Sequence, residues 1–474
     1  MIITMKMITV IAVAAVVVGA TAGIAYMLLT QDDGPDGPNI SAGLEVYGNA
    51  DGDWKIDEND INIIQKIIDG ELDPEDYPLA DANQDGIIDE KDIEHVRAIM
   101  NASPTNRVEV FHINHHTVRG PYVASTMYPI TSAVSTGASN TLLNFKYLGI
   151  VDQIHGLSFN SPPDSVLFYE YTSLFGSGSN LGQVSGGTTS VNNMDYEKVV
   201  ALKLSHGVQA IVTADNNNYV NGTTTGTGGT EAAFEAAGID VVRIKMTAAD
   251  PDEWFSALLM MAFLFDADGT EYMDKCLEMI IWYQDLLADI DSKVGGLTDS
   301  ERVSAIASSS DGNVSSHLSD FTDVLTIAGA KYPSSIVSHL GSSYTSTVVS
   351  YKEHNNETWL RAHDVDKVIN IRVSPTGTSW YGGTAPGHAN INNMMTQFDK
   401  LQAYENNNVY IMSGDMPVML RIAYAAEILY PDLFGEGYAD SLHVDFADRF
   451  LGFDSEFMEG KKFVITMADL GLAN

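Results

Sequence analysis

Apolar and polar positions divide the chain into a long apolar start, a short helical region and an alternating region. Residues 7–30 carry no charge and are mostly Ile, Val, Ala, Met and Leu. Residues 31–42 are rich in Asp, Gly and Pro, which predicts a linker. Apolar residues then recur at helical spacing in Ile61–Ile68 and Ile93–Met100. We therefore expect a small all-α module over residues 43–103.

From residue 108 onward, short apolar runs typical of strands alternate with helical stretches, which predicts an α/β fold with a helix-covered parallel sheet. Residues 251–294 form one long helical region in the middle. We expect an N-terminal lobe at 108–250 and a C-terminal lobe at 295–474, joined by an inter-lobe helix at 251–294. The expected strands are Val108–Ile113, Tyr122–Ser125, Ile154–Phe159, Ala210–Ala214, Val241–Lys245, Val303–Ala307, Val368–Val373 and Val409–Met412.

Net charge narrows the choice of partners. The 474 residues contain 63 acidic and 25 basic side chains, a net charge of −38. Phosphates would be repelled, so no nucleic acid is expected as a partner. The acidic side chains are densest in residues 31–100, where bound cations would neutralise part of the charge.

The apolar start predicts where the protein works. About 20 apolar residues suffice to span a bilayer, and Lys6 precedes the run in residues 7–30. Residues 1–30 therefore predict an N-terminal transmembrane helix that anchors the protein to the cell membrane. A cleaved signal peptide, cut near Ala20-Thr21-Ala22, is the alternative. Both alternatives place the rest of the chain outside the cytoplasm.

Two acidic stretches repeat one design, with oxygen side chains at loop positions 1, 3, 5, 9 and 12. Calcium takes six to eight oxygen ligands, and a twelve-residue loop can wrap one ion with this spacing. We therefore expect two calcium ions; an acidic surface without ions is the alternative. The candidate ligands are Asn49, Asp51, Asp53, Lys55 (by its carbonyl), Asp57 and Asp60, and then Asp81, Asn83, Asp85, Ile87 (by its carbonyl), Asp89 and Asp92.

The doubled pattern D-x-N-x-D-G-x-x-D-x-x-D over residues 43–103 resembles a type I dockerin. The resemblance implies EF-hand-like calcium loops, each followed by a helix, and attachment to a cohesin module on another surface protein. Position 6 departs from the pattern, because it is Trp54 in the first loop and Gly86 in the second. A bulky residue held in the left-handed conformation costs roughly 1–2 kcal/mol. The second loop is therefore expected to hold calcium more tightly.

Four stretches after residue 108 follow one another in the order of a known family: Asn193–Val212, Ala236–Val242, Asn406–Tyr410 and Leu429–Phe434. Through them, this region resembles the substrate-binding proteins of iron-siderophore, haem and cobalamin importers, in particular archaeal members. The resemblance implies a two-lobed class III periplasmic-binding-protein fold, a metal-chelate ligand and an ABC permease as partner. It also implies permease docking through Glu197 and Glu357, whose alternative is that of ordinary acids near a helix start.

Loops that follow strand ends are expected to line the ligand site. No nucleophile elbow, phosphate loop or metal-hydrolase motif appears, so we expect no catalytic residues and favour a binding protein. A surface-complex enzyme acting on polysaccharide and a structural adaptor without ligand are the alternatives. The candidate ligand-binding residues are Tyr128, His155, Asn216, Tyr219, Arg372, Trp380, Tyr381 and Asp415.

Overall fold

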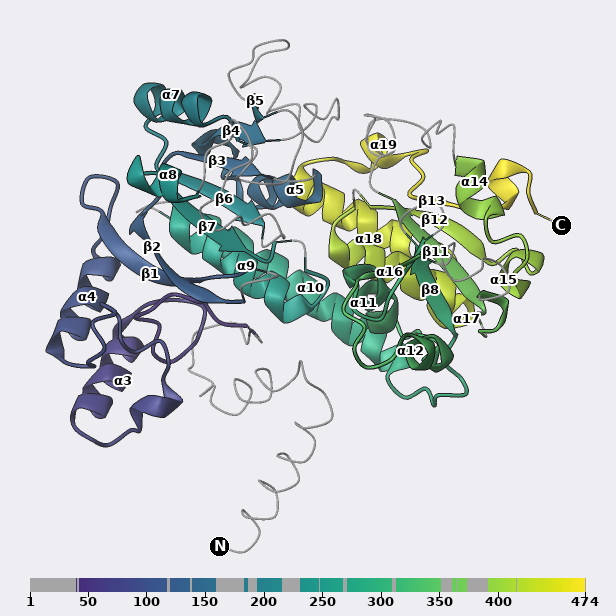
Figure 1. The fold of residues 1–474 in the computed structure, drawn as a ribbon, viewed down its shortest axis with the longest axis horizontal. Helices are drawn as coiled ribbons and strands as arrows, with labels where there is room; N and C mark the ends of the chain where they lie inside the picture. Colours follow the sequence, from purple (N-terminus) through teal and green to yellow (C-terminus); the bar gives the residue numbers. More distant parts are fainter. Residues whose placement is uncertain are drawn as a thin grey trace, which may run out of the picture.

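A computed structural model gives the arrangement of most of the chain, in which a small helical module precedes two α/β lobes (Figure 1). The expected anchor at residues 1–30 and most of the linker lie outside the described residues. Within the part of the chain that is described, no helix is long and apolar enough to cross a membrane. The described residues are 40, 42–116, 120–136, 139–158, 183–185, 194–214, 231–246, 248–266, 271–308, 313–350, 360–363, 365–372, 391–414 and 416–473.

The helical module contains two matched helices, α3 (Glu58–Ile68) and α4 (Glu90–Met100), with a short 3-10 turn, η1 (Pro74–Asp76), between them. Both helices begin with the same capping box, in which an Asp at the N-cap and an Asp three residues later satisfy each other's backbone N–H groups. Apolar residues three apart turn one face of each helix inward. These faces form a core of their own, made of Ala50, Ile61, Ile64, Ile67, Ala80, Ala82, Ile93 and Val96.

The first lobe combines a hairpin with a parallel sheet. β1 (Val108–Asn114) and β2 (Tyr122–Tyr128) pair antiparallel. Five further strands follow in the order β5-β4-β3-β6-β7, all parallel. They are β3 (Ala133–Thr136), β4 (Ile154–Ser158), β5 (Gln183–Ser185), β6 (Ala210–Ala214) and β7 (Asp240–Ile244), with α5 (Ser139–Leu148), η2 (Val151–Gln153), α7 (Tyr196–His206) and α8 (Glu231–Ala236) between them.

Two consecutive helices, α9 (Pro251–Phe265) and α10 (Tyr272–Val294), lie where a single inter-lobe helix was expected. Asp250 caps α9 by accepting hydrogen bonds from two backbone N–H groups, and Pro251 occupies its first position. Nearly all of α9 is buried, whereas α10 buries one face. α10 contacts α5 in the first lobe and α16 (Val418–Leu429) in the second, so it is the element that joins the lobes.

The second lobe has a four-stranded sheet in the order β13-β12-β11-β8 and a separate hairpin. β8 (Ala305–Ser308), β11 (Lys367–Arg372) and β12 (Val409–Ser413) are parallel, and β13 (Val464–Ile465) is antiparallel. The hairpin pairs β9 (Asn313–Ser315) with β10 (Val348–Ser350). The remaining elements are α11 (Asp320–Ile327), α12 (Ser334–Leu340), α14 (Ile391–Thr396), α15 (Gln402–Glu405), α17 (Pro431–Phe434), α18 (Tyr438–Phe446), η5 (Ala447–Leu451), α19 (Ser455–Met458) and η6 (Ala468–Leu470).

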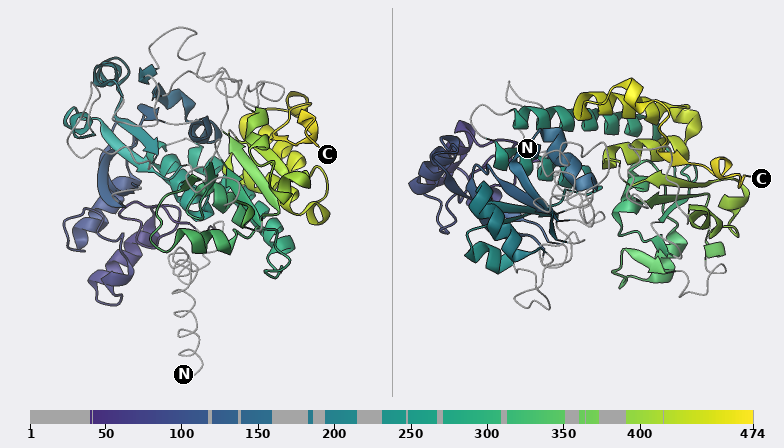
Figure 2. Two further views of the ribbon diagram at one scale, coloured as in Figure 1. Left: turned by 45° about the vertical axis from the view of Figure 1, so that its right-hand side comes forward. Right: turned by 90° about the horizontal axis from the view of Figure 1, so that it is seen from above.

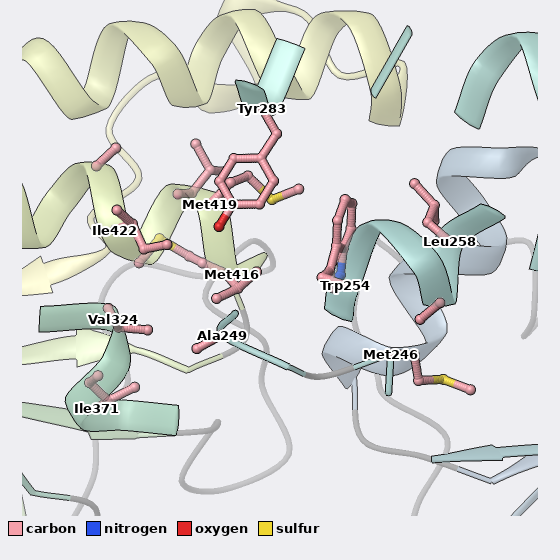
Figure 3. Close-up of a cluster of buried hydrophobic side chains, with 14 of the residues drawn as sticks. Met246, Ala249, Trp254, Leu258, Tyr283, Val324, Ile371, Met416, Met419 and Ile422 are labelled. Atoms are coloured by element: carbon pink, nitrogen blue, oxygen red, sulfur yellow. The ribbon is translucent and has the colours of Figure 1, made fainter. Parts of the chain in front are cut away.

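One hydrophobic core runs through both lobes. Trp254 of α9 meets Tyr283 of α10 edge to face, with ring centroids 5.8 Å apart, and Met419 of α16 lies in the same cluster (Figure 3). Tyr147 of α5 packs on Phe446 of α18 at 5.3 Å. The helices α10 and α18, teal and yellow, lie along one side of the lobes in the view from above (Figure 2). The lobes therefore share a packed base as well as a connecting helix.

Candidate functional site

The two acidic loops have the same hydrogen-bond pattern. At position 12, Asp60 accepts from the backbone N–H groups of Asp51 and Asp57, at 3.2 and 2.7 Å. Asp92 accepts from the equivalent groups of Asn83 and Asp89, at 3.1 and 2.8 Å. In both loops the side chains at positions 3, 5 and 9 also accept from the N–H two residues further on. The sequence repeat is thus a repeat of conformation.

The side-chain oxygens at position 1 of the two loops are the feature that best fits a bound cation. The side-chain oxygen Asn49 Oδ1 is buried, and so is Asp81 Oδ1, and neither has a hydrogen-bond partner in the described part of the chain. Asn49 uses its Nδ2 to donate to the carbonyls of Leu44 and Asp53, both at 2.8 Å. Asp81 uses Oδ2 to accept from Gly86 N at 3.0 Å. A buried acceptor without a donor is costly, and a bound cation would satisfy it.

Burial acts strongly on the carboxyl groups of the first loop. It raises the pKa of Asp60 to about 9, with the charge of Asp51 adding to the effect. It also raises the pKa of Asp53 to about 7 and raises the pKa of Asp51. In the second loop burial raises the pKa of Asp92. These carboxylates are unfavourable as bare anions, and calcium would supply the missing positive charge.

The carboxylates are held by backbone amides and are not gathered around one point. Across the described ranges, no group of three or more His, Cys, Asp or Glu side chains is arranged to hold a metal ion. The residue types, their spacing and the two unpartnered oxygens fit calcium. If calcium binds, the oxygens of positions 1, 3, 5, 9 and 12 would hold it together with the carbonyls of Lys55 and Ile87.

The backbone strain expected at Trp54 is absent. Gly86 does have a positive φ, of 87°, but Trp54 is not among the residues with positive φ. In the first loop Gly52, at position 4, has a φ of 74°. The turn is therefore made at a glycine, and the argument that strain weakens the first loop does not apply.

Two expected ligand-binding residues lie at the edge of the first lobe where the parallel strands begin. His155 is the second residue of β4, and its ring lies 5.0 Å from that of His206 at the end of α7. Tyr128 stacks on Phe263 of α9 at 4.5 Å, and its neighbour Met127 bonds to Asp240, the first residue of β7. Loops that follow the strands lie at the opposite edge of the sheet, away from His155 and Tyr128.

Of the other expected contacts, the structure describes one in part. Arg372 is the last residue of β11, and only its backbone is described. Outside the described residues lie Asn216, Tyr219, Trp380, Tyr381 and Asp415.

Of the two docking candidates, Glu197 is exposed in the first turn of α7. A helix that connects parallel strands runs antiparallel to them, so its first turn lies at the edge where the strands end. Glu197 therefore stands on the same side as the expected ligand loops. Glu357 lies outside the described residues.

Polar groups buried at the strand ends were not anticipated. Asn370 of β11 donates to Ser308 Oγ at 3.2 Å, and its own Oδ1 is buried with no partner among the described residues. In the first lobe, Arg243 of β7 forms a buried ion pair with Glu231 and donates to the carbonyl of Ala214 at 3.3 Å. A single polar residue within an apolar strand, as in Val-Ile-Asn-Ile and Val-Val-Arg-Ile, could have indicated these buried polar groups from the sequence.

A surface pocket of about 580 Å³ opens elsewhere, between Arg361, His363, Lys400 and Gln402. Val365, just before β11, also lines it, so it lies at the strand starts of the second lobe. Asn370 is not among the residues that line it.

Known structures share the arrangement of the two lobes. The chain superposes on the TroA-like periplasmic binding protein FepB from Veillonella parvula with a TM-score of 0.50 and 16% identity, covering 75% of this chain and 99% of that one. MolA, the molybdate periplasmic binding protein of a Haemophilus influenzae ABC transporter, gives 0.50 and 15%, covering 70% and 96%. No protein-family model and no curated protein sequence matches. The chain has the two-lobed α/β fold of periplasmic binding proteins.

Proposed function

We propose that the protein is the extracytoplasmic solute-binding component of an ABC importer, with a metal chelate as its ligand. The observation that carries the proposal is the fold, which covers 99% of FepB and 96% of MolA. Asn370 Oδ1, buried near the strand ends with no partner among the described residues, adds hydrogen-bonding capacity at the edge where such folds hold ligands. Trp380 and Tyr381, which follow β11 in the sequence, would offer flat apolar surfaces that suit a macrocycle or an aromatic chelate.

Titration followed by tryptophan fluorescence tests the ligand class. Ferric siderophores, haem and corrinoids form one arm, and molybdate, the ligand of MolA, forms a second. Saturable quenching by one chelate supports the proposal. A response to molybdate alone would replace the chelate by an oxyanion, and a flat response in both arms would remove the importer proposal. The variant Asn370→Ala should weaken the response, whereas Gln402→Ala, in the unrelated surface pocket, should not.

Permease docking follows from the same proposal. Glu197 in the first lobe and Glu357 in the second would each meet arginines of the permease through charge-assisted hydrogen bonds. Reversing the charge with Glu197→Arg should abolish uptake while leaving solute binding intact. Normal uptake by this variant would exclude Glu197 from docking.

The acidic loops support a second component, calcium-dependent attachment. Their repeated hydrogen bonds and the unpartnered oxygens Asn49 Oδ1 and Asp81 Oδ1 favour two calcium ions. We propose that α3 and α4 then bind a cohesin-like module of another surface protein, with the N-terminal segment tethering the chain to the membrane. Calorimetry of the full chain with calcium, followed by a purified type I cohesin with calcium or EDTA, separates the two steps. Calcium heat without cohesin binding would leave the ions and remove the partner.

A further inference from the structure

The segment that leads into the first acidic loop belongs to the first lobe as much as to the module. Ile40, Ala42, Leu44 and Val46 are buried in the core that runs through the lobes, and so is Ile99 of α4. The module's own core is separate and smaller. The module is thus attached to the lobe by packed apolar side chains, and Figure 1 shows α4 next to β1.

Residues 45–47 extend the β1–β2 hairpin. Tyr47 N donates to the carbonyl of Phe111 at 2.9 Å, and Ile113 N donates to the carbonyl of Glu45 at 3.0 Å. Val46 and His112 form an antiparallel bridge between these bonds. The carboxylate of Glu45 also lies 2.6 Å from His115 Nε2. A strand of three residues makes few hydrogen bonds to β1. Whether residues 45–47 stay ordered therefore depends on the contacts at the edge that faces away from β1.

The first acidic loop supplies hydrogen bonds to the segment just before this strand. Leu44 N donates to the carbonyl of Asp53, at loop position 5, at 2.8 Å. Asn49, at position 1, donates to the carbonyls of Leu44 and Asp53. The second loop differs, because its side-chain hydrogen bonds in the described structure stay within residues 81–92. Among the described residues, the first loop therefore bonds directly to residues 44–47, whereas the second loop is reached only through the bond of 2.7 Å from Gly48 N to the carbonyl of Leu79, which precedes it.

At its C-terminal end, β1 is bonded to β7. Asn114 Nδ2 donates to the carbonyl of Val241, and Arg243 N donates to Asn114 Oδ1, both at 2.7 Å. His115 N donates to the carbonyl of Arg243 at 3.0 Å. Arg243 in turn pairs with Glu231 at the strand ends of the lobe. Ordered contacts thus run from the first loop to the edge where ligand is expected.

We propose that calcium in the first loop is an internal brace, which fixes residues 44–47 on β1 and so stabilises the first lobe of the same chain. The proposal rests on the calcium sites of the proposed function and is independent of solute and cohesin. The buried, unpartnered Asn49 Oδ1 offers a cation a ligand, and the bonds that join Asn49 and Asp53 to Leu44 pass the ordering of this loop to residues 44–47. Because the ion binds the ordered loop, it opposes opening of every contact that the loop supports.

Hydrogen exchange of the full chain in detergent tests the brace at the amides of Tyr47 and Ile113, with amides of β12 as an internal reference. At a calcium concentration of 100 times the dissociation constant, exchange at both amides should slow by about 100-fold relative to EDTA. Asp53→Asn should abolish this protection, and the matched Asp85→Asn in the second loop should leave most of it. Both variants keep an oxygen that can accept the local backbone bond.

Calorimetry on the same samples separates the possible failures. Calcium heat without any change at Tyr47 and Ile113 would overturn the brace and leave the calcium sites intact. Equal loss of protection in Asp53→Asn and Asp85→Asn would also overturn it, because the first loop would have no special part. Absence of heat would remove the calcium sites and the brace together, while the fluorescence titration with chelates would still decide the solute-binding function.

Discussion

Replacing Asn49 by Asp should destabilise the calcium-free protein, although aspartate is the usual residue at position 1 of a calcium loop. The Asn49 amide donates two hydrogen bonds of 2.8 Å, to the carbonyls of Leu44 and Asp53, and the side chain is fully buried. A carboxylate has no hydrogens to donate and would face two carbonyl oxygens. Each carbonyl keeps a backbone donor, Val46 N for Leu44 and Leu44 N for Asp53. Losing two buried bonds at 0.5–1.5 kcal/mol each, and placing a carboxylate oxygen against both carbonyls, costs about 2–3 kcal/mol.

Hydrogen exchange at Leu44 and Tyr47 in EDTA measures this cost directly. A loss of about 2–3 kcal/mol corresponds to exchange faster by roughly 30- to 150-fold. The matched change at position 1 of the second loop, Asp81→Asn, keeps an acceptor for Gly86 N and should change exchange by less than about threefold. If Asn49→Asp exchanges at the wild-type rate in EDTA, or if both variants behave alike, the two-donor role of Asn49 is wrong. Saturating calcium should restore part of the loss, because the new carboxylate would be a ligand.

Three further predictions concern pH, charge and packing. The folded-state pKa values of Asp53 and Asp60 are raised to about 7 and about 9, above the unfolded value near 4. The contribution of these two groups to calcium-free stability is therefore fully present below about pH 4 and should be lost as pH rises toward 9. Urea unfolding in EDTA at several pH values checks this, and a rise over that range would contradict it. Arg243→Met should cost about 3–5 kcal/mol by leaving Glu231 buried and unpaired, and adding Glu231→Leu should recover most of the loss. Urea unfolding gives the free energy of unfolding of the single and double variants. Equal values for the two variants would show that Glu231 is not destabilising once Arg243 is removed. Gly329→Ala should lower the melting temperature measurably, because φ is 98° and a Cβ would stand 3.0 Å from Tyr430 and Val294, whereas Gly296→Ala, with open space around it, should not.

The strands predicted from apolar runs are present, and Ala210–Ala214 has the expected bounds. β3 was missed because Ala-Val-Ser-Thr carries two hydroxyls and resembles a loop, yet it is the central strand between β4 and β6. The β1–β2 pair was expected within the parallel sheet and is an antiparallel hairpin. The seven residues between these strands are too few for a crossover, which was an available signal.

The acidic loops could be predicted in detail because every partner lies within twelve residues. The repeated spacing located the two loops and the helices that follow them, whereas the N-cap role of Asp57 and Asp89 was not anticipated. The attachment of residues 44–47 to β1 could not be predicted, since it joins residues more than sixty positions apart and leaves no periodic pattern. The expected single helix was wrong for a local reason, since Asp266-Ala-Asp-Gly interrupts the apolar run between α9 and α10.

The base shared by the two lobes has a kinetic consequence. α10 passes from one lobe to the other, and Tyr147 of the first lobe is packed on Phe446 of the second. With that base in place, solute would meet two surfaces already held at a set separation, so its arrival need not wait for a slow rearrangement of the whole molecule. Related ligands would then differ chiefly in how long they stay bound. Release of the bound solute to the proposed permease would then limit the rate of uptake.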